Sequence, residues 1–208
     1  HSGASMNFIK TYTPANASLT GFASNVTGAA FTLTASTSGD SLAHQVSIRN
    51  DSATDHSGKT VTLVGTDHLG RALTEIVTAP GTSATVESAG YFLTLTSATP
   101  SATIGADTFD IGWVDEFVTP AITMDWSSGV GALRLTITGT ISVDLDSSND
   151  DIQNSTSSVS WLVDSTANTA VTASQWCTFN ATPRFIRVKA NSYSSGATVK
   201  LAYAQRNK

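Results

Sequence analysis

Acidic residues crowd one short stretch of this sequence, where their oxygen atoms could bind a metal ion. Asp144, Asp146, Asp150 and Asp151 all fall within residues 144–151. Carboxylates gathered in a loop suit Ca²⁺, which takes about six to eight oxygen ligands. The EF-hand pattern is absent, because its glycine is missing and Ser155 stands where that pattern needs a bidentate glutamate. The sequence therefore favours an exposed acidic hairpin loop, and we expect no metal and no other cofactor.

A second group of acidic residues lies in the middle of the chain. It comprises Asp107, Asp110, Asp115 and Glu116, with Glu87 as a further candidate. Paired carboxylates carry out glycoside hydrolysis. On a strand, however, Asp110 and Trp113 would point to opposite faces, so this segment does not build an aromatic-floored cleft by itself. We therefore do not predict a glycosidase.

The tetrapeptide Gly39-Asp40-Ser41-Leu42 spells the motif of the GDSL hydrolases. In that family the serine is a nucleophile at a strand-to-helix turn, within reach of a base and of oxyanion donors. Residues 43–48 alternate like a strand, so no helix is expected after Ser41. The family also needs a histidine late in the chain, and none follows His68. We expect no esterase and predict no catalytic residue.

The histidines and the cysteine give no further site. His1, His44, His56 and His68 lack the i, i+2 or i, i+4 spacing that would direct two of them at one metal ion. His56 and His68 fall in predicted turns, where exposure to solvent is expected. Cys177 is the only cysteine, which excludes an intrachain disulfide, and its apolar neighbours predict a buried residue of a strand. A lone thiol fits assembly in a reducing cell better than secretion.

The elements that would have to position any of these residues are strands. Only 13% of the residues are charged, and the chain is instead rich in threonine and serine. Threonine is β-branched and fits a pleated, half-buried surface better than a helix. The runs 60–64, 93–96 and 133–138 alternate apolar with polar residues, as strands with one buried face do. We predict an all-β protein with two tandem antiparallel β-sandwich or jelly-roll-like domains.

The strand-like runs fall into two series with a break near residue 116. Strands are expected over 30–34, 45–50, 60–66, 72–78, 84–87, 92–96 and 108–114, and then over 122–126, 132–138, 140–145, 157–163, 175–179, 185–190 and 198–204. Gly139 separates two of these runs and predicts a tight hairpin or a bulge. The predicted domains are therefore 29–116 and 117–208.

Residues 6–28 precede the first series and are irregular in pattern. They are predicted to form an N-terminal arm that docks on a neighbouring molecule, or a short edge strand followed by a loop. Phe8, Ile9 and Tyr12 are the expected partner-binding anchors of this arm, because a flexible arm would bind through its apolar side chains.

Charge argues against nucleic acid as a partner, and hydropathy argues against a membrane. The net charge is −5, and the lysines and arginines are scattered, so nucleic acid is not an expected partner. No apolar run approaches the roughly 20 residues of a membrane-spanning helix.

Carbohydrate binding needs only exposed aromatic side chains, although most aromatic residues here alternate with apolar neighbours and are expected in the core. The candidates are Tyr91, Trp113, Trp126, Trp161, Trp176 and Tyr193.

One part of the sequence has the order strand, polar turn, strand, glycine-bounded loop and strand, and it comprises residues 57–77, 90–97 and 104–105. Within the stretch 44–113 this order resembles virion structural proteins of tailed bacteriophages. The second half, through residues 122–126, 133–138, Trp161, 183–188 and 196–201, is similar to such proteins as well.

The resemblance implies a non-enzymatic virion component, a capsid decoration or cement protein that binds the major capsid protein or other virion proteins. Such a protein is assembled in the host cytoplasm. A cyclic homo-oligomer, such as a trimer, would bury sheet edges that a single domain leaves open. The alternative is a tail or head fibre or adhesin domain that binds host-surface glycans through exposed aromatic residues of the second domain. A secreted adhesin or carbohydrate-binding module is a third interpretation.

Overall fold

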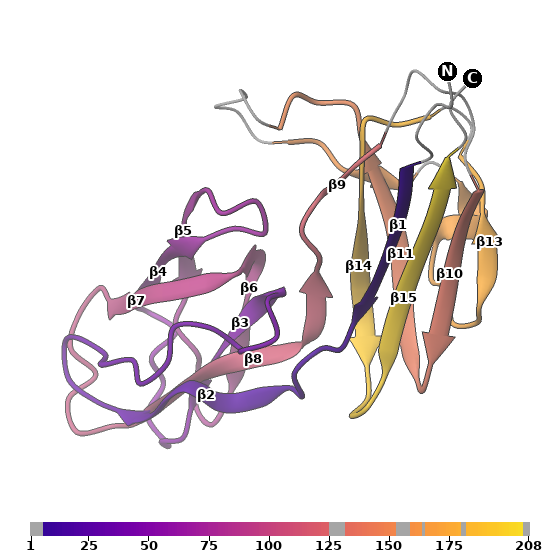
Figure 1. The fold of residues 1–208 in the computed structure, drawn as a ribbon. Coiled ribbons are helices and arrows are strands. Elements are labelled where there is room, and N and C mark those ends of the chain that lie inside the picture. The colour runs from indigo at the N-terminus through magenta and orange to yellow at the C-terminus, as the bar shows by residue number, and fades with distance from the viewer. Residues whose placement is uncertain (1–5, 125–131, 153–158, 164, 180–181, 206–208) are drawn as a thin grey trace. The chain divides into compact units, whose positions relative to one another are not determined.

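The computed structural model describes residues 6–124, 132–152, 159–163, 165–179 and 182–205 (Figure 1). Its regular structure is almost entirely antiparallel β-strand, and the described residues contain one short 3-10 helix, Thr166–Asn168. The prediction of an all-β protein is confirmed. None of the described residues forms a helix that is long and apolar enough to cross a membrane.

The chain divides into two compact units. The first unit is Ala15–Val118, and the second unit combines His1–Pro14 with Thr119–Lys208. The predicted boundary near residue 116 therefore lies close to the observed change at 118/119. The units do not follow one another simply along the chain, however, because the N-terminal strand belongs to the second unit.

Two sheets form the first unit. One has the order β2-β8-β3-β6, made of β2 (Ser18–Val26), β8 (Phe109–Val118), β3 (Ala43–Asn50) and β6 (Thr85–Phe92). The other has the order β5-β4-β7, made of β5 (Ala72–Thr78), β4 (Thr60–Thr66) and β7 (Thr94–Pro100). The core of the unit lies between the two sheets, and Ile48, Ile111 and Leu63 are fully buried there. In β4 every second residue faces this core.

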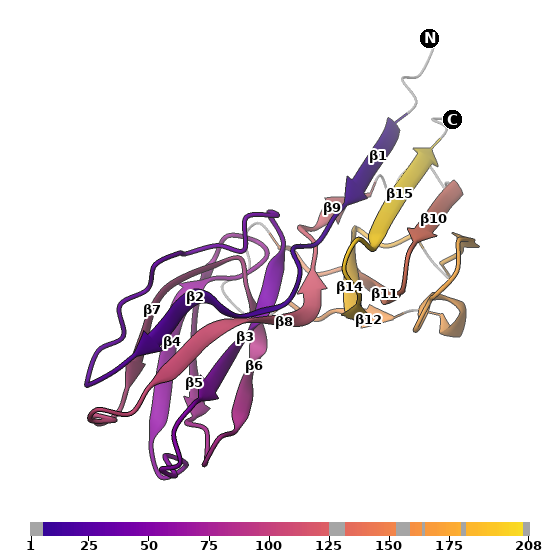
Figure 2. The same ribbon diagram turned by 90° about the horizontal axis from the view of Figure 1, so that it is seen from below.

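The second unit is built in the same way (Figures 1 and 2). Its first sheet has the order β1-β15-β10-β13, made of β1 (Met6–Tyr12), β15 (Thr198–Gln205), β10 (Ala132–Thr138) and β13 (Gln175–Cys177). In its second sheet β14 (Phe185–Tyr193) pairs with β9 (Ile122–Thr123) and β11 (Ile141–Ser148), and β11 pairs with β12 (Leu162–Val163). Leu135 and Leu201 from the first sheet and Leu145 and Val188 from the second are fully buried.

The predicted N-terminal arm is replaced by two strands that belong to different units. Residues 6–12 are β1, which pairs with β15 along its whole length, from Met6 opposite Gln205 to Tyr12 opposite Val199. Residues 18–26 are β2, which pairs with β8. Of the two interpretations that the sequence left open for this segment, the edge strand describes 6–12.

Two further expectations from the sequence are wrong. The expected strand 30–34 is irregular, although Phe31 is buried. Gly139 adopts a φ of 75°, but it marks neither a hairpin nor a bulge, because β10 and β11 lie in different sheets. The chain crosses there from one layer of the second unit to the other.

Candidate functional site

Asp40, the acid of the Gly-Asp-Ser-Leu tetrapeptide, is the centre of a hydrogen-bond cluster in the first unit. Its Oδ2 accepts hydrogen bonds from the Ala15 N–H (2.6 Å) and from His44 Nε2 (2.8 Å). Its Oδ1 accepts from the Ser38 hydroxyl (2.6 Å) and from the Leu42 N–H (2.9 Å). Only 6% of the Asp40 side chain and 1% of the His44 side chain are exposed. The carboxylate therefore links residues 38–42, which precede β3, to Ala15 at the start of the first unit.

This environment keeps Asp40 ionised. Burial on its own would raise the pKa of the carboxyl, but the hydrogen bonds from His44, Ser38 and Ala15 outweigh burial and lower the pKa from 3.8 to about 2. Ser41 is exposed, has a φ of 64°, and is followed by β3 instead of a helix. The tetrapeptide is a turn held by its aspartate, and its geometry differs from that of a hydrolase nucleophile.

The lowered pKa of Asp40 predicts a loss of stability in acid. The folded pKa lies below the unfolded one, so the ionised group stabilises the fold above about pH 4, by about 2 kcal/mol. This contribution is lost as the pH falls from 4 towards 2. Urea unfolding of the first unit near pH 6 and near pH 2 measures the loss. The Asp40→Asn variant should show a weaker pH dependence, and an unchanged dependence would assign the effect to other carboxyl groups.

His56 is buried, although the sequence predicted an exposed turn residue. Its Nε2 lies 2.9 Å from Asp107 Oδ2, and its ring packs edge-on against Phe109. The Lys59 ammonium donates to His56 Nδ1 (2.9 Å) and to the Thr103 carbonyl (2.8 Å). An ammonium can only donate, so Nδ1 is an acceptor and Nε2 carries the proton that binds Asp107. The hydrogen bond from His56 lowers the pKa of Asp107. These hydrogen bonds join the loop that contains His56 and Lys59 to the loop that contains Thr103 and Asp107.

The other acids of the middle group do not converge. Asp110 is buried and accepts a hydrogen bond from the Asn25 N–H (2.9 Å). A hydrogen bond shared with Asp110 raises the pKa of the neighbouring Asp51 carboxyl. Glu116 instead accepts a hydrogen bond from the Tyr91 hydroxyl (3.0 Å). Asp110 and Glu116 therefore have different partners. The carboxyls of Asp51 and Asp110 are in hydrogen-bond contact, which is closer than the roughly 5–9.5 Å between the two acids of a glycoside hydrolase.

The predicted acidic hairpin loop is in part a strand, because β11 continues to Ser148. Asp146 is buried and pairs with the Arg187 guanidinium, with its Oδ2 at 2.9 Å from both Nε and Nη2. Asp144 accepts from the Ala170 N–H and Asp150 from the Ser160 N–H. Within the described ranges, no three His, Cys, Asp or Glu side chains are arranged to hold a metal ion.

The predicted anchors of the arm are divided between the two faces of β1. Tyr12 is buried, with only 4% exposed, and Phe8 is half-buried. Both line a depression of about 220 Å³ together with Lys10 and residues 120–123. Ile9 points to the opposite face and is 68% exposed. The anchors are therefore constituents of a folded sheet.

Two of the six aromatic candidates are buried in the core, as expected, while Tyr91 and Trp161 are half-buried. Trp113 and Tyr193 are buried, and Trp161 stacks on Arg187 at 4.4 Å from the ring centre. Trp126 lies outside the described residues. Trp176 differs from these, because 65% of its surface is exposed. Its neighbour Cys177 points inward, and burial raises the pKa of the thiol.

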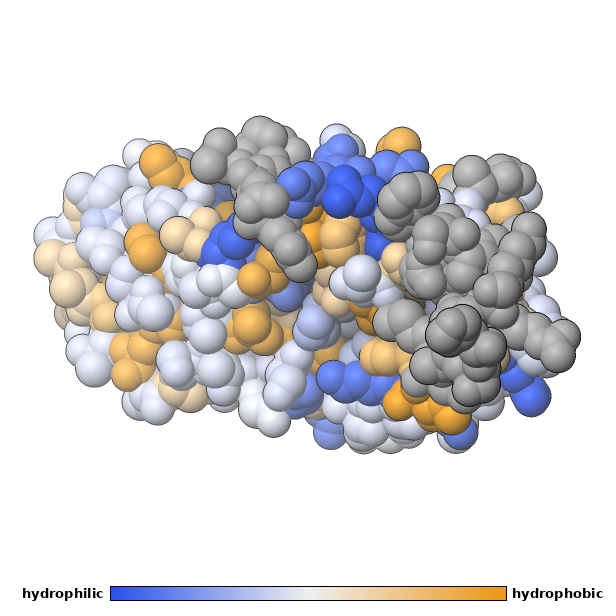
Figure 3. Space-filling model, turned by 45° about the horizontal axis from the view of Figure 1, so that its top comes forward, coloured by the Kyte–Doolittle hydropathy of each residue, from blue (hydrophilic) through white to orange (hydrophobic). Residues whose placement is uncertain are grey.

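One exposed surface is uncharged over its whole extent. The outer side of the β5-β4-β7 sheet, here called the threonine face, carries Thr60, Thr62, Val64, Thr66, Thr74, Ile76, Thr78, Thr94 and Thr99. Ile76 is 67% exposed and Val64 is 36% exposed. Pale, near-neutral residues also dominate the visible surface of the first unit in Figure 3.

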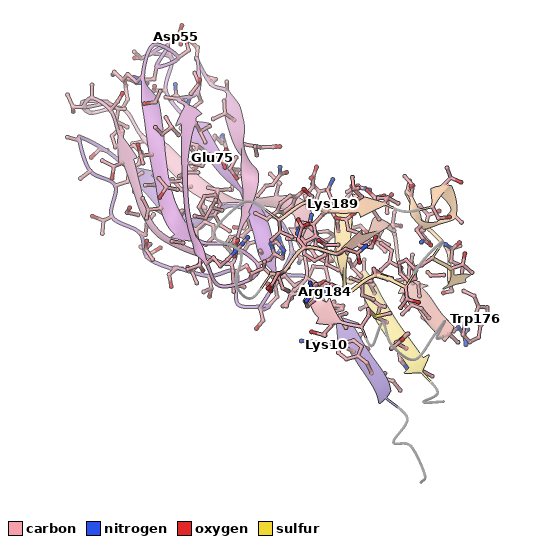
Figure 4. The ribbon with its side chains drawn as sticks, turned by 90° about the horizontal axis from the view of Figure 1, so that it is seen from above. Lys10, Asp55, Glu75, Trp176, Arg184 and Lys189 are labelled. Atoms are coloured by element: carbon pink, nitrogen blue, oxygen red, sulfur yellow. The ribbon has the colours of Figure 1, made fainter. Side chains whose placement is uncertain are left out.

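A second surface lies on the outer side of the β1-β15-β10-β13 sheet. A shallow trough of about 220 Å³, here called the Trp176 trough, is lined there mainly by Ile9, Ala132, Arg134, Trp176, Ala202 and Ala204. The Arg134 guanidinium lies 5.9 Å from the centre of the Trp176 ring. Lys10 on β1 and Trp176 on β13 mark the two edge strands of this sheet in Figure 4.

A scan against protein-family models, a search of the curated proteins and a search of the solved structures each found no match to this chain. The functional interpretation therefore depends on the two surfaces and on the resemblance carried by the sequence.

Proposed function

We propose that the protein is a non-enzymatic structural component of a bacteriophage virion, a decoration protein that binds the capsid through its threonine face. The observation that carries this proposal is an exposed sheet face, three strands wide, whose outward residues include no charge. The hairpin of β4 and β5 and the strand β7 form this face, and the same segments carry the resemblance to virion proteins.

The composition of the face suits a broad contact with another protein. Charged residues are depleted in the centre of protein interfaces, because removing a charge from water costs more than removing a hydroxyl. Threonine offers a methyl group and a hydroxyl on a stiff side chain, so little conformational entropy is lost on binding. Ile76 and Val64 are the apolar residues on which a partner would pack.

The polar clusters support a structural role as well. The buried acids and histidines of the first unit bind backbone groups or one another, as Asp40 with His44 and His56 with Asp107 show. Their hydrogen bonds stabilise loops and strand ends. A protein that lies on a capsid needs such rigidity more than it needs a reactive side chain.

The charge variant Ile76→Lys is expected to reduce capsid binding at least about tenfold, because the lysine would have to be desolvated in the contact. Co-sedimentation with decoration-free capsids of the parent phage measures the binding. The matched control is Leu19→Lys, which changes an exposed apolar residue of β2 in the other sheet of the first unit. Both variants should keep the wild-type circular dichroism spectrum.

The possible outcomes test the virion role and the threonine face as the binding surface separately. If the wild-type protein is absent from purified particles and does not sediment with capsids, the virion role is wrong. If both lysine variants sediment like wild type, the role stands and the threonine face is the wrong surface. Equal loss in both variants would indicate a general effect of added charge, and this would also count against the face.

A further inference from the structure

The Trp176 trough is shaped by the register of four strands. Trp176 on β13 lies opposite Arg134 on β10, Arg134 lies opposite Ala202 on β15, and Ala202 lies opposite Ile9 on β1. Strands are about 4.8 Å apart, so this row is about 14 Å long. Large apolar side chains stand at its two ends, and Arg134 and Ala202 lie between them. Ala132 and Ala204 form the next opposed pair and extend the low floor.

The trough combines an aromatic face with positive charge. Trp176 and Ile9 are 65% and 68% exposed, so the apolar ends are open to a ligand. The Arg134 guanidinium lies over the Trp176 ring in a cation–π contact, and Lys200 is the next outward residue of β15 after Ala202. Among the described outward residues of these four strands there is no aspartate or glutamate. The trough is therefore locally cationic in a protein of net charge −5.

We infer that the Trp176 trough binds one acidic sugar residue, a pyranose ring that bears a carboxylate. The C–H groups on one face of such a ring pack against the indole, whose π face carries partial negative charge. The Arg134 guanidinium pairs with the carboxylate, for which its planar fork of donors is suited. The alanine floor leaves room for the ring, and Ile9 contacts its far edge.

The size and charge of the trough favour a sugar over two other ligands. Pockets for drug-sized molecules measure about 300–1,000 Å³, so a trough of about 220 Å³ fits a single ring. A stable protein partner covers about 800 Å² on each side, far more than one row of side chains offers. Single-stranded nucleic acid would stack on Trp176 too, but it needs a basic groove that follows several phosphates. This inference does not depend on the capsid-binding role.

The test is a titration of the whole protein with glucuronic acid, followed by the indole N–H signal of Trp176 in ¹H–¹⁵N NMR spectra. Binding of a single ring to a shallow site is expected with a Kd of about 1 mM. Glucose is the neutral probe, and its Kd should be about tenfold higher, because it lacks the carboxylate that Arg134 binds. A disaccharide ending in glucuronate distinguishes a glycan terminus from the free sugar.

Three variants assign the contacts. Trp176→Ala should weaken glucuronate binding at least about tenfold. Because this variant lacks the indole signal, its binding is measured by the backbone amide signals of Ala202 and Ala204. Arg134→Gln should weaken glucuronate binding to the level of glucose and leave glucose binding unchanged. Leu162→Ala is the matched control, because Leu162 is 70% exposed on β12 in the other sheet of the unit and should bind as wild type does.

The assignment is overturned if the Trp176 signal does not move at about ten times the expected Kd, or if Trp176→Ala binds like wild type. Tighter binding of a single-stranded oligonucleotide than of glucuronate would also overturn it and indicate a base-stacking surface. Capsid sedimentation of Trp176→Ala should equal that of wild type, so failure of the sugar site is distinguishable from failure of the virion role.

Discussion

A chain that begins at Ala15 is expected to keep the first unit folded and to lose the folded second unit. The truncation removes β1, which pairs with β15 along seven consecutive positions. It also removes Tyr12, which is 4% exposed, and the half-buried Phe8. Burial of two aromatic side chains contributes on the order of 5 kcal/mol. This is comparable with the whole free energy of unfolding of a small domain.

Hydrogen exchange followed by mass spectrometry measures the effect separately in peptides from each unit. Amides of β15 and β10 should exchange freely in the truncated chain, while amides of β3 and β8 stay protected. The control is Thr11→Ala, since Thr11 is exposed on β1 and its replacement keeps the strand. Wild-type protection of β15 after truncation would show that β1 is dispensable, and residues 6–12 would then be an arm after all.

The strands that the sequence predicted best are those whose partners are nearby in the chain. The expected strands 60–66 and 72–78 coincide with β4 and β5. Asp67 closes the turn between them, because its carboxylate accepts from the Leu69 and Arg71 N–H groups and pairs with the Arg71 guanidinium. Alternation and turn chemistry are both local signals, so the sequence alone predicts this hairpin.

The segment 6–28 could not be assigned in this way. β1 finds its partner at the opposite end of the chain, and β2 pairs with β8 through a register that shifts twice. The local sequence pattern does not indicate a partner strand that lies so far away in the chain. His56 illustrates the same limit, because the residue that binds it, Asp107, follows 51 positions later. Burial of a polar turn residue depends on that distant contact.

The Trp176 trough was partly predictable. Cys177 was expected to be buried, and side chains alternate along a strand, so Trp176 had to point outward. The same reasoning directs Arg134 away from Leu133 and Leu135, which are buried. The sequence did not indicate that β10 and β13 are neighbours. That pairing alone places the indole beside the guanidinium.

Replacing Gly112 by alanine is expected to destabilise the first unit by about 3 kcal/mol. Gly112 is buried in β8, and a Cβ there would lie 1.8 Å from the Ser18 carbonyl oxygen and 2.6 Å from the Leu19 carbonyl carbon. Both atoms belong to the backbone of β2, so no side-chain rotation relieves the overlap. β2 would have to move, and Phe22 and Ala23 would leave the core with it.

The matched control is Gly58→Ala, because a Cβ at Gly58 meets no atom within 4 Å. That variant should stay within about 0.5 kcal/mol of wild type. Urea unfolding, followed by the indole N–H signal of Trp113 in ¹H–¹⁵N NMR spectra, reports on this site, since the Trp113 ring packs against Phe22 at 5.0 Å and its Nε1 donates to the Asn16 carbonyl. Equal unfolding midpoints for the two alanine variants would mean that β2 does not approach β8 this closely. In that case the segment 18–26 would be a loop over the sheet, and the first unit would begin at β3.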